Sequence, residues 1–457
     1  MHPVTVQASL LSAVASYNRP LWSIFVQYSR NRFLSSLRTG LLIGELIIEE
    51  GDLKHHFGAE RPGALPVLLT IHDENAWARM ALSLDLGFAE AYMYAELDCS
   101  SLKSLFHLWL LNRTTLTGAS TFMDMVSAAL SAVLIRTLGR QTLKMARWNV
   151  EVAYDTSNEF YQCFLSKEMM YSCALWSDDE GGVRGDLSTG PRSGDLEAAQ
   201  LRKIKHILQK ARLRSGDRLL EVGSGWGAMA ITAAKMGCTV DTVTLSVEQK
   251  AMAERRALEE GVAERVRVHL LDYRQLPASF EHAFDAFVSC EMIEAVGPSH
   301  HNAYFRMVDW ALKSDRGAAV ITATAQPESR YSDYQSDCFA RHYHWPNTFL
   351  PSATSLPVWV QTAIPGRLVL DSVEDHGIHY PRTLREWGRR LQKNFTGASV
   401  ESMQAKYPEL ADERKLEIFK RKWLYMFEYA EAGYARAYTS LNCWTFARPE
   451  NVAMVCD

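Results

Sequence analysis

From about residue 196 onward, short apolar runs are separated by longer stretches whose apolar residues recur at helical spacing. The runs predict strands at Arg218–Val222, Thr239–Leu245, Val266–Leu271, Ala286–Ser289 and Val320–Ala325. The stretches around them predict helices at Leu196–Ala211, Ala228–Met236 and Val247–Glu260. Strands that alternate with helices predict an α/β fold in which helices cover both faces of a parallel sheet.

The N-terminal part has a different pattern. Between about residues 30 and 115, strand-like runs at Leu41–Ile48 and Pro66–Ile71 accompany a helix at Ala76–Leu86, which predicts a small α+β domain. Residues Leu116–Val152 are helical and apolar in pattern. Because 457 residues exceed what one hydrophobic core usually serves, we expect a division into 1–115, 116–152 and 153–457.

Two further segments carry specific expectations. The most apolar stretch, Met123–Leu138, is shorter than the roughly 20 residues of a spanning helix and contains Asp124 and Arg136, so a buried or interfacial helix is predicted. The stretch Gly182–Gly194 is rich in Gly, Ser, Asp and Arg and predicts a surface loop with little to bury. The N-terminus has no basic segment before its apolar stretch, so no secretory signal is expected.

Composition narrows the class of protein. Hydrophobic residues make up 47% and charged residues 22%, as in ordinary globular proteins, and a net charge of −4 without a long Lys/Arg run does not indicate a nucleic-acid binder. The eight cysteines form no CxxC pair, which predicts reduced thiols in a cytosol-like compartment. The pairs His55-His56, His300-His301 and His342-x-His344 lack carboxylate or Cys partners at metal spacing, so no metal site is expected.

A glycine-rich turn joins the first predicted strand to the next helix. Residues 221–227 read E-V-G-S-G-W-G, and glycines there allow a tight turn and a close approach of the backbone to a ligand. A dinucleotide fingerprint would be GxGxxG with an acid at the tip of the second strand, where this chain has Thr244-Leu245-Ser246. The pattern therefore favours S-adenosylmethionine over NAD, with Asp272 and Tyr273 after the third strand as candidates to flank the adenine.

A signature before this turn resembles a known family. Residues 154–161 read Y-D-T-S-N-E-F-Y and residues 169–174 read M-M-Y-S-C-A. Both are similar to the signature of cyclopropane synthases, which recurs in mycolic-acid cyclopropane synthases and related lipid methyltransferases. Further similar segments extend to Trp387, so the resemblance covers most of the chain from Tyr154 to the C-terminus. It implies a class I S-adenosylmethionine methyltransferase domain, Rossmann-like, preceded by a smaller α+β domain.

The resemblance also implies roles for individual residues. The residues expected to line the cofactor site are Tyr171, Ser172, Gly223, Gly225, Thr244, Leu245, Gln249 and Tyr273. Cys173, Glu294 and Tyr380 are expected around the reacting carbon, where the family holds a bicarbonate ion that acts as base.

One position departs from the family pattern. The family has His, or in some branches Gln, where this chain has Thr322. A Thr hydroxyl still hydrogen-bonds an anion but carries no charge and reaches less far. Three explanations stay open: weaker bicarbonate binding, substitution by His342 or His344, or a different reaction.

The expected function is methylene transfer to the double bond of an unsaturated phospholipid acyl chain, forming a cyclopropane. The segment Gly87–Met93 with Asp98 resembles the accessory domain of the phospholipid-acting enzymes. The resemblance further implies a cytoplasmic enzyme that associates with the membrane surface, and a homodimer. The alternatives are methyl-branching of the same chains, small-molecule N-methylation, and a catalytically inactive lipid-binding protein.

Overall fold

The computed structural model describes residues 19–59, 65–116 and 157–451, which form two compact units. The first comprises the N-terminal part together with residues 412–432, and the second comprises most of the chain from residue 135 to 411 together with the C-terminal residues from 433. Almost all of the predicted connection 116–152, including Met123–Leu138, lies outside the described residues. The three-part division therefore stays a prediction.

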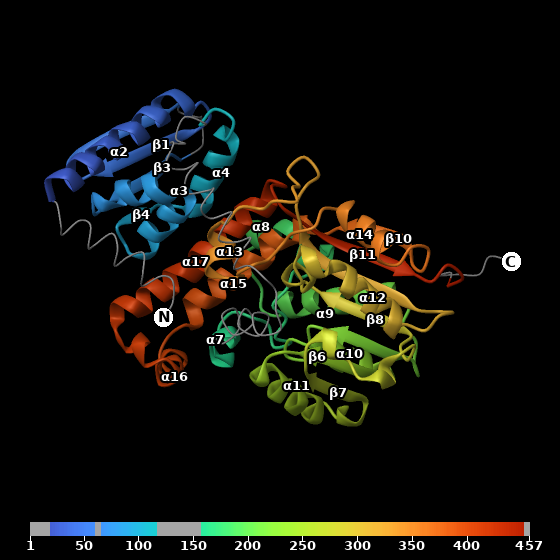
Figure 1. The fold of residues 1–457 in the computed structure, drawn as a ribbon. Coiled ribbons are helices and arrows are strands. Elements are labelled where there is room, and N and C mark those ends of the chain that lie inside the picture. Colours follow the sequence, from blue (N-terminus) through green and yellow to red (C-terminus); the bar gives the residue numbers. More distant parts are fainter. Residues whose placement is uncertain (1–18, 60–64, 117–156, 452–457) are drawn as a thin grey trace. The chain divides into compact units, whose positions relative to one another are not determined.

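The N-terminal unit is a small α+β structure (Figure 1, blue to cyan, with α17 in orange-red). Its sheet has the strand order β2-β1-β3-β4, in which β1 and β3 are parallel and the other pairs antiparallel. Its elements are α2 (Arg19–Gly40), β1 (Glu45–Glu50), β2 (Leu53–Gly58), β3 (Val67–Ile71), α3 (Asn75–Met93), β4 (Leu97–Cys99), α4 (Leu102–Asn112) and most of α17 (Glu413–Ala435). The expected α+β class is confirmed, although the sequence pattern predicted only two of the four strands.

The second unit contains a seven-stranded sheet of order β10-β11-β9-β8-β5-β6-β7. Its strands are β5 (Arg218–Val222), β6 (Thr239–Thr244), β7 (Val266–Leu270), β8 (Ala286–Cys290), β9 (Ala318–Ala325), β10 (Val369–Asp375) and β11 (Ser440–Ala447). The five strands β5 to β9 are parallel, and β11 runs antiparallel to both β9 and β10. This confirms the predicted α/β methyltransferase fold and adds an antiparallel edge that the sequence pattern did not predict.

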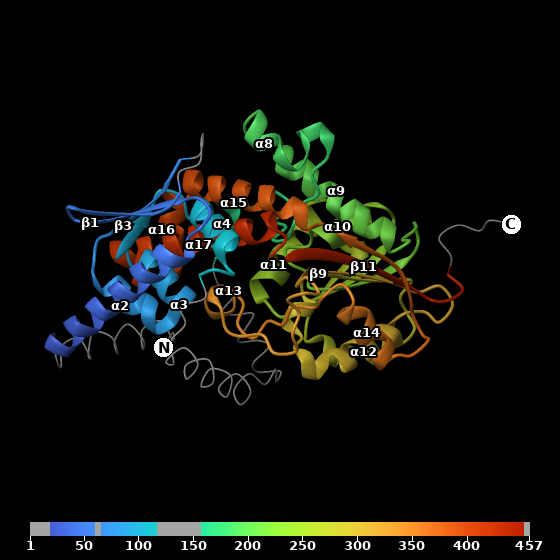
Figure 2. The same ribbon diagram turned by 90° about the horizontal axis from the view of Figure 1, so that it is seen from above.

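Helices cover both faces of this sheet. Alternate strand residues point to opposite faces, so Leu219 packs against α9, α10 and α11 whereas its neighbour Leu220 packs against α12 and α14. Figure 2 shows α9 and α10 on one side of the strands and α12 and α14 on the other. The bounds of the helices are α9 (Asp195–Lys210), α10 (Ala228–Lys235), α11 (Val247–Glu259), α12 (His301–Ala311), α14 (Ser355–Ala363) and α15 (Tyr380–Asn394).

The prediction of a loop with little to bury at Gly182–Gly194 was wrong. A short helix, α8 (Gly185–Ser188), begins there, and Asp186 within it is only 5% exposed. The Asp186 carboxylate accepts hydrogen bonds from Arg385 at 2.7 Å and Arg389 at 3.0 Å, both on α15. A buried carboxylate needs charged or hydrogen-bonding partners, and Asp186 has two arginines. The polar composition of residues 182–194 is therefore explained in part by a buried ion-pair network.

No helix in the described ranges has both the length and the apolar character required to cross a lipid bilayer.

Candidate active site

The connectivity of the sheet fixes where a ligand binds. From β5 the chain proceeds outward to β6 and β7 and then returns to β8 on the other side of β5. Ligands of open α/β sheets bind outside the carboxyl ends of the strands at such a switch point. The turn after β5 and the turn after β8 both lie at this edge of the sheet.

The glycine turn after β5 has the backbone that the sequence predicted. Gly223, Gly225 and Gly227 have φ of +101°, +48° and +87°. A Cβ on Gly225 would meet no atom within 4 Å, whereas one on Gly227 would lie 3.0 Å from the Cβ of Ala253 on α11. Gly227 is therefore needed for helix packing, and Gly225 leaves open space beside the strand tip.

Buried polar side chains hold this turn. The Thr242 hydroxyl lies 2.6 Å from Glu221 Oε2 and 2.7 Å from Ser224 Oγ. Burial raises the pKa of Glu221 to about 8. The side chains of Glu221, Thr242 and Ser224 connect β5, β6 and the turn. This buried network holds the backbone of the glycine turn in place.

The tips of β6 and β7 bring the next predicted residues to the same edge. Thr244 Oγ1 donates to Gln249 Oε1 at 2.8 Å, and Leu245 is half-buried beside them. Asp272 accepts bonds from Arg274 Nε and NH2, both at 2.7 Å. Arg274 thus forms hydrogen bonds with both carboxylate oxygens of Asp272. Recognition of adenine by Asp272 therefore stays a prediction. We call the glycine turn and these two tips the cofactor edge.

Tyr273 and Tyr171 contribute aromatic surfaces. Tyr273 packs edge-on against Tyr304 at 5.3 Å, and burial raises its pKa to about 12. Tyr171 lies 5.2 Å from Trp387 and 5.4 Å from Tyr161, measured between ring centroids. These rings provide a rigid apolar boundary close to the segment that carries Ser172 and Cys173.

The turn after β8 places a glutamate between two of the predicted residues. Glu291 Oε1 accepts a bond from the backbone N–H of Cys173 at 3.0 Å, and Glu291 Oε2 accepts one from the Tyr380 hydroxyl at 2.6 Å. Glu291 has φ +50°, which a residue other than glycine rarely adopts. Burial raises the pKa of Glu291, against the opposing effects of the Tyr380 hydrogen bond and the Lys203 charge. Strain and a buried carboxylate at one position are typical of functional sites.

Glu294, the glutamate that the resemblance indicated, is buried one turn later. Its Oε1 accepts a bond from the backbone N–H of Thr324 at 2.7 Å, while its Oε2 is buried without a hydrogen-bond partner among the described residues. Burial, followed by the charge of Glu291, raises the pKa of Glu294 to about 8.

Tyr434 links the two parts of the site, because its ring stacks on Tyr380 at 4.3 Å and its hydroxyl lies 2.9 Å from Thr324 Oγ1. We call Cys173, Glu291, Glu294 and Tyr380 the reacting centre.

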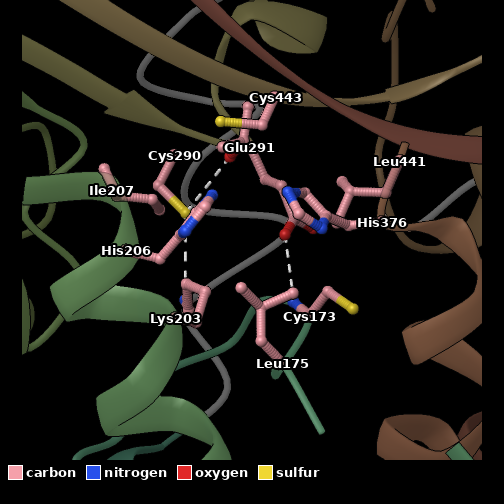
Figure 3. A pocket seen from close by; sticks show the side chains of 11 residues that line it. Cys173, Leu175, Lys203, His206, Ile207, Cys290, Glu291, His376, Leu441 and Cys443 are labelled. Carbon is pink, nitrogen blue, oxygen red and sulfur yellow. Dashed lines mark hydrogen bonds between the residues drawn. The ribbon is translucent and has the colours of Figure 1, made fainter. Parts of the chain in front are cut away.

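Lys203 adds a positive charge that the sequence did not predict. It lies on α9, is 5% exposed, and donates through Nζ to Ser172 Oγ. Its Nζ is 3.9 Å from Cys290 Sγ, which in turn is 3.4 Å from Thr322 Oγ1. Figure 3 shows the pocket that Lys203 lines together with Cys173 and Glu291.

Thr322 also lines this pocket, whereas His342 and His344 are not among its lining residues. His342 Nδ1 instead lies 2.9 Å from Asp337 Oδ2. Within this pocket, Lys203 is the cation that is linked to Thr322 through Cys290.

Two functional candidates, Glu291 and Lys203, were missed from the sequence. Lys203 had a detectable signal, since it shares the helix face of Ala199, Gln200 and Ile207, all of which are buried. A lysine at such a position on an amphipathic helix indicates a buried charge. Glu291 had no comparable signal, because the E-M-I-E segment offers two glutamates and only the turn geometry distinguishes them.

Comparison with known proteins identifies the family. The family model described as mycolic acid cyclopropane synthetase matches residues 141–429, which is more than half of the chain. The chain belongs to this family. It is an S-adenosylmethionine-dependent methyltransferase of the group that includes the fatty-acyl methyltransferases and cyclopropane synthases, as the sequence predicted.

Relatives and solved structures agree with this assignment. The cyclopropane-fatty-acyl-phospholipid synthase of Escherichia coli K12 is 31% identical over 388 residues, which cover 84% of this chain and 89% of that protein. A tuberculostearic acid methyltransferase of Mycobacterium tuberculosis is 32% identical over 66% of this chain, and the match spans 65% of that relative's length.

Two solved structures share the fold. A mycolic acid cyclopropane synthase complexed with SAH and CTAB has a TM-score of 0.52 at 24% identity, covering 66% of this chain and 98% of that chain. Coclaurine N-methyltransferase has a TM-score of 0.57 at 16% identity, covering 79% of this chain and 99% of that chain. At these identities the likeness concerns the fold alone.

Proposed function

We propose that this methyltransferase acts on the double bond of an unsaturated acyl chain in a phospholipid and forms a cyclopropane ring. The observation that carries the proposal is the extent of the match to the E. coli phospholipid synthase. The matched length is greater than that of residues 153–457, so the match continues into the N-terminal unit. A relative that shares only the methyltransferase fold would not share that unit.

The cofactor edge fits the methyl donor. The open space at Gly225 allows a ligand to approach the backbone, and the free N–H groups at the start of α10 follow directly. S-adenosylmethionine bound there supplies an electrophilic methyl group. An alkene is a weak nucleophile, so the residues around it must hold both reactants at roughly 3–3.5 Å and exclude water.

The aromatic residues next to Cys173 suit the charge that develops on the substrate. Methylation of an alkene leaves a carbocation on the acyl chain, which water would quench. The rings of Tyr171, Trp387 and Tyr161 offer faces that attract a cation and at the same time exclude water. We propose that this group of rings borders the acyl chain.

The reacting centre fits a bicarbonate ion. With a pKa raised to about 8, the Glu294 carboxyl is neutral at pH 7. Because Oε1 accepts the Thr324 N–H, the proton resides on Oε2, which has no partner among the described residues and is therefore a buried donor awaiting an acceptor. Bicarbonate held by Glu294 would supply the base that removes a proton from the new methyl group.

In this arrangement Tyr380 and Glu291 have positioning roles. Tyr380 donates to Glu291 and stacks on Tyr434, while Glu291 fixes the backbone of Cys173. Cys173 itself has a thiol whose pKa burial raises well above the ordinary value, so we assign it a place in the wall of the site and no nucleophilic attack.

A second candidate function is methyl-branching of the same acyl chains. Thr322 stands where the resemblance places a histidine, and a tuberculostearic acid methyltransferase is as similar in sequence as the cyclopropane synthase. A site that removes the proton from the neighbouring chain carbon, instead of from the new methyl group, would leave a methyl-branched alkene in place of a ring.

The substrate also implies a location and a partner. An acyl chain within a bilayer requires that the enzyme work at a membrane surface, so we propose peripheral association from the cytoplasm. The homodimer that the resemblance suggests belongs to the same proposal, and light scattering of the purified protein tests it.

The proposal is tested with labelled S-adenosylmethionine and vesicles of unsaturated phospholipid. We expect label in the acyl chains and, by proton NMR, ring methylene signals. A ring and a methyl-branched alkene both add one CH₂ and have equal mass. Because the unreacted substrate has alkene protons of its own, the signal that would instead support methyl-branching is that of a new methyl group on a double bond in the labelled product. Vesicles of saturated phospholipid are the control, and equal labelling of both vesicle types would contradict the proposal. Activity that is unchanged after removal of dissolved CO₂ would contradict the role of bicarbonate.

A further inference from the structure

Four side chains suited to binding a metal ion gather beside the pocket of Figure 3. They are His206 on α9, Glu374 in β10, His376 directly after β10, and Cys443 in β11. Their nearest ligand atoms all lie within 4.8 Å of one another. Three of the four, the two histidines and Cys443, line the pocket itself.

The fold explains why these residues meet. Glu374 and Cys443 are register partners on neighbouring antiparallel strands, so their side chains emerge on the same face of the sheet. His376 lies two positions beyond Glu374. Helix α9 covers this face, because Cys443 belongs to the same hydrophobic cluster as Ile204 and Ile207. His206 is adjacent to Ile207 and reaches the cluster from the helix.

The distances are close to those of a metal site. His206 Nε2 lies 2.6 Å from Glu374 Oε2, and His376 Nε2 lies 3.4 Å from the same oxygen. Zinc bonds of about 2.0–2.3 Å in tetrahedral geometry place ligand atoms about 3.3–3.8 Å apart. Small side-chain rotations would therefore admit an ion between the four atoms.

A simple ion pair does not account for the whole cluster. His206 and Lys210 already provide partners for Glu374, the latter through Nζ at 2.5 Å from Oε1. His376 Nε2 is buried and forms no hydrogen bond within the described part of the chain. Cys443 is 1% exposed, and a thiol adds nothing to an ion pair. A metal ion would provide a partner for both.

The surroundings also orient the ligands. Because Lys210 holds Oε1 of Glu374, Oε2 remains directed toward the two histidines. The backbone N–H of His376 donates to Leu441 O at 2.7 Å, and Asp375 Oδ1 accepts the Gly377 N–H at 2.8 Å, which fixes the turn after β10. Outer contacts of this kind are typical of metal sites.

We propose that His206, Glu374, His376 and Cys443 bind one zinc ion per chain in a closed tetrahedral site. Two imidazoles, a thiolate and a carboxylate form a donor set that zinc prefers, and four protein ligands indicate a structural role. The ion joins α9 to β10 and β11. Lys203 lies one turn before His206 on the same helix, so the ion also fixes the lysine opposite Ser172 and Cys290. The proposal does not depend on which lipid the enzyme methylates.

The test uses the full-length protein without an affinity tag. After removal of metal with a chelator, the protein is titrated with Co²⁺, which substitutes for zinc and is visible by absorption. We expect about one Co²⁺ per chain, the spectrum of a tetrahedral ion, a sulfur-to-cobalt charge-transfer band, and displacement of Co²⁺ by Zn²⁺. Wild-type protein that lacks stoichiometric binding or the charge-transfer band would overturn the proposal, independently of any variant.

Variants then assign the ligands. Cys443→Ser is expected to abolish the charge-transfer band. His376→Ala should weaken binding more than about 100-fold, because the loss of an outer contact of a metal ligand alone costs about 10- to 100-fold. Cys338→Ser is the matched control, because Cys338 is half-buried and lies outside the cluster. A charge-transfer band that persists in Cys443→Ser but disappears in Cys338→Ser would contradict the assignment.

Discussion

The cofactor edge and the reacting centre belong to the same unit but are built differently. The cofactor edge is made of consecutive residues at the tips of β5, β6 and β7, and its decisive feature is backbone with positive φ. The reacting centre is made of side chains from distant segments, among them Cys173, Glu291 and Tyr380. Its decisive feature is the burial of titratable groups, because the pKa values of Glu291 and Glu294 are both raised and the charge of Lys203 acts on Glu291.

The difference shows what each part of the reaction requires. S-adenosylmethionine is a methyl donor that many methyltransferases share. Binding it requires a backbone turn that a ligand can approach closely, which a short glycine segment provides. Controlling a carbocation and its proton needs an electrostatic environment, which only tertiary packing provides. Substitutions in the reacting centre should therefore reduce turnover, and those in the cofactor edge should weaken cofactor binding.

The largest effect is expected from Glu291→Gln. The amide oxygen of glutamine can still accept the hydrogen bond from the Tyr380 hydroxyl. Its NH₂ group would then face the backbone N–H of Cys173, and two hydrogen-bond donors in contact repel each other. We expect kcat to fall about 10²- to 10³-fold, which corresponds to losing a preorganised polar contact in a buried site. The affinity for S-adenosylmethionine, measured by calorimetry, should stay within a factor of three. Exposed Glu264→Gln is the control, and full activity of the Glu291 variant would remove this residue from the site.

Tyr380→Phe and Cys173→Ala should follow, in that order. Phenylalanine retains the stacking on Tyr434 but loses the hydroxyl that donates to Glu291, and we expect about a 10- to 100-fold loss of kcat. Cys173 contacts Glu291 through its backbone N–H, which alanine retains, so a loss of about 10-fold or less is expected. Steady-state kinetics of both variants gives the order, and a larger loss for Cys173→Ala would show that the thiol itself takes part.

Gly225→Ala tests the cofactor edge. Gly225 has φ +48° and Gly397 has φ +49°, and a Cβ on either would meet no atom within 4 Å. Both alanine variants should be less stable than the wild type, because residues with a Cβ rarely adopt a positive φ. Only Gly225→Ala should weaken the binding of S-adenosylmethionine, about 10-fold, because its Cβ enters the space next to the strand tip. Equal affinities of the two variants would place the cofactor elsewhere.

The same contrast explains what the sequence could reveal. The predicted strand Arg218–Val222 coincides with β5, and the neighbouring strands and helices differ by one or two residues, because their patterns are local. Strand β10 was missed since most of its residues are exposed at the edge of the sheet, where no alternation is required. Glu291 and the cluster of His206 with Cys443 could not be predicted, because a turn and strand pairing across distant segments create them.

The last prediction concerns the pH dependence of stability and reports on the charge of Glu294 in the reacting centre. Burial raises the pKa of Glu294 to about 8 in the folded protein, whereas an unfolded glutamate titrates near its ordinary value of 4.5. The folded state therefore retains a proton that the unfolded state releases, and the stabilisation present below pH 4.5 is lost as the pH rises toward 8. Stability should fall by about 1.4 kcal/mol per pH unit in this window relative to Glu294→Gln, which cannot titrate there. Urea unfolding of both proteins at a series of pH values measures the difference. Parallel curves would mean that Glu294 is ionised in the folded enzyme, and it could then not donate the hydrogen bond that the proposed bicarbonate site requires.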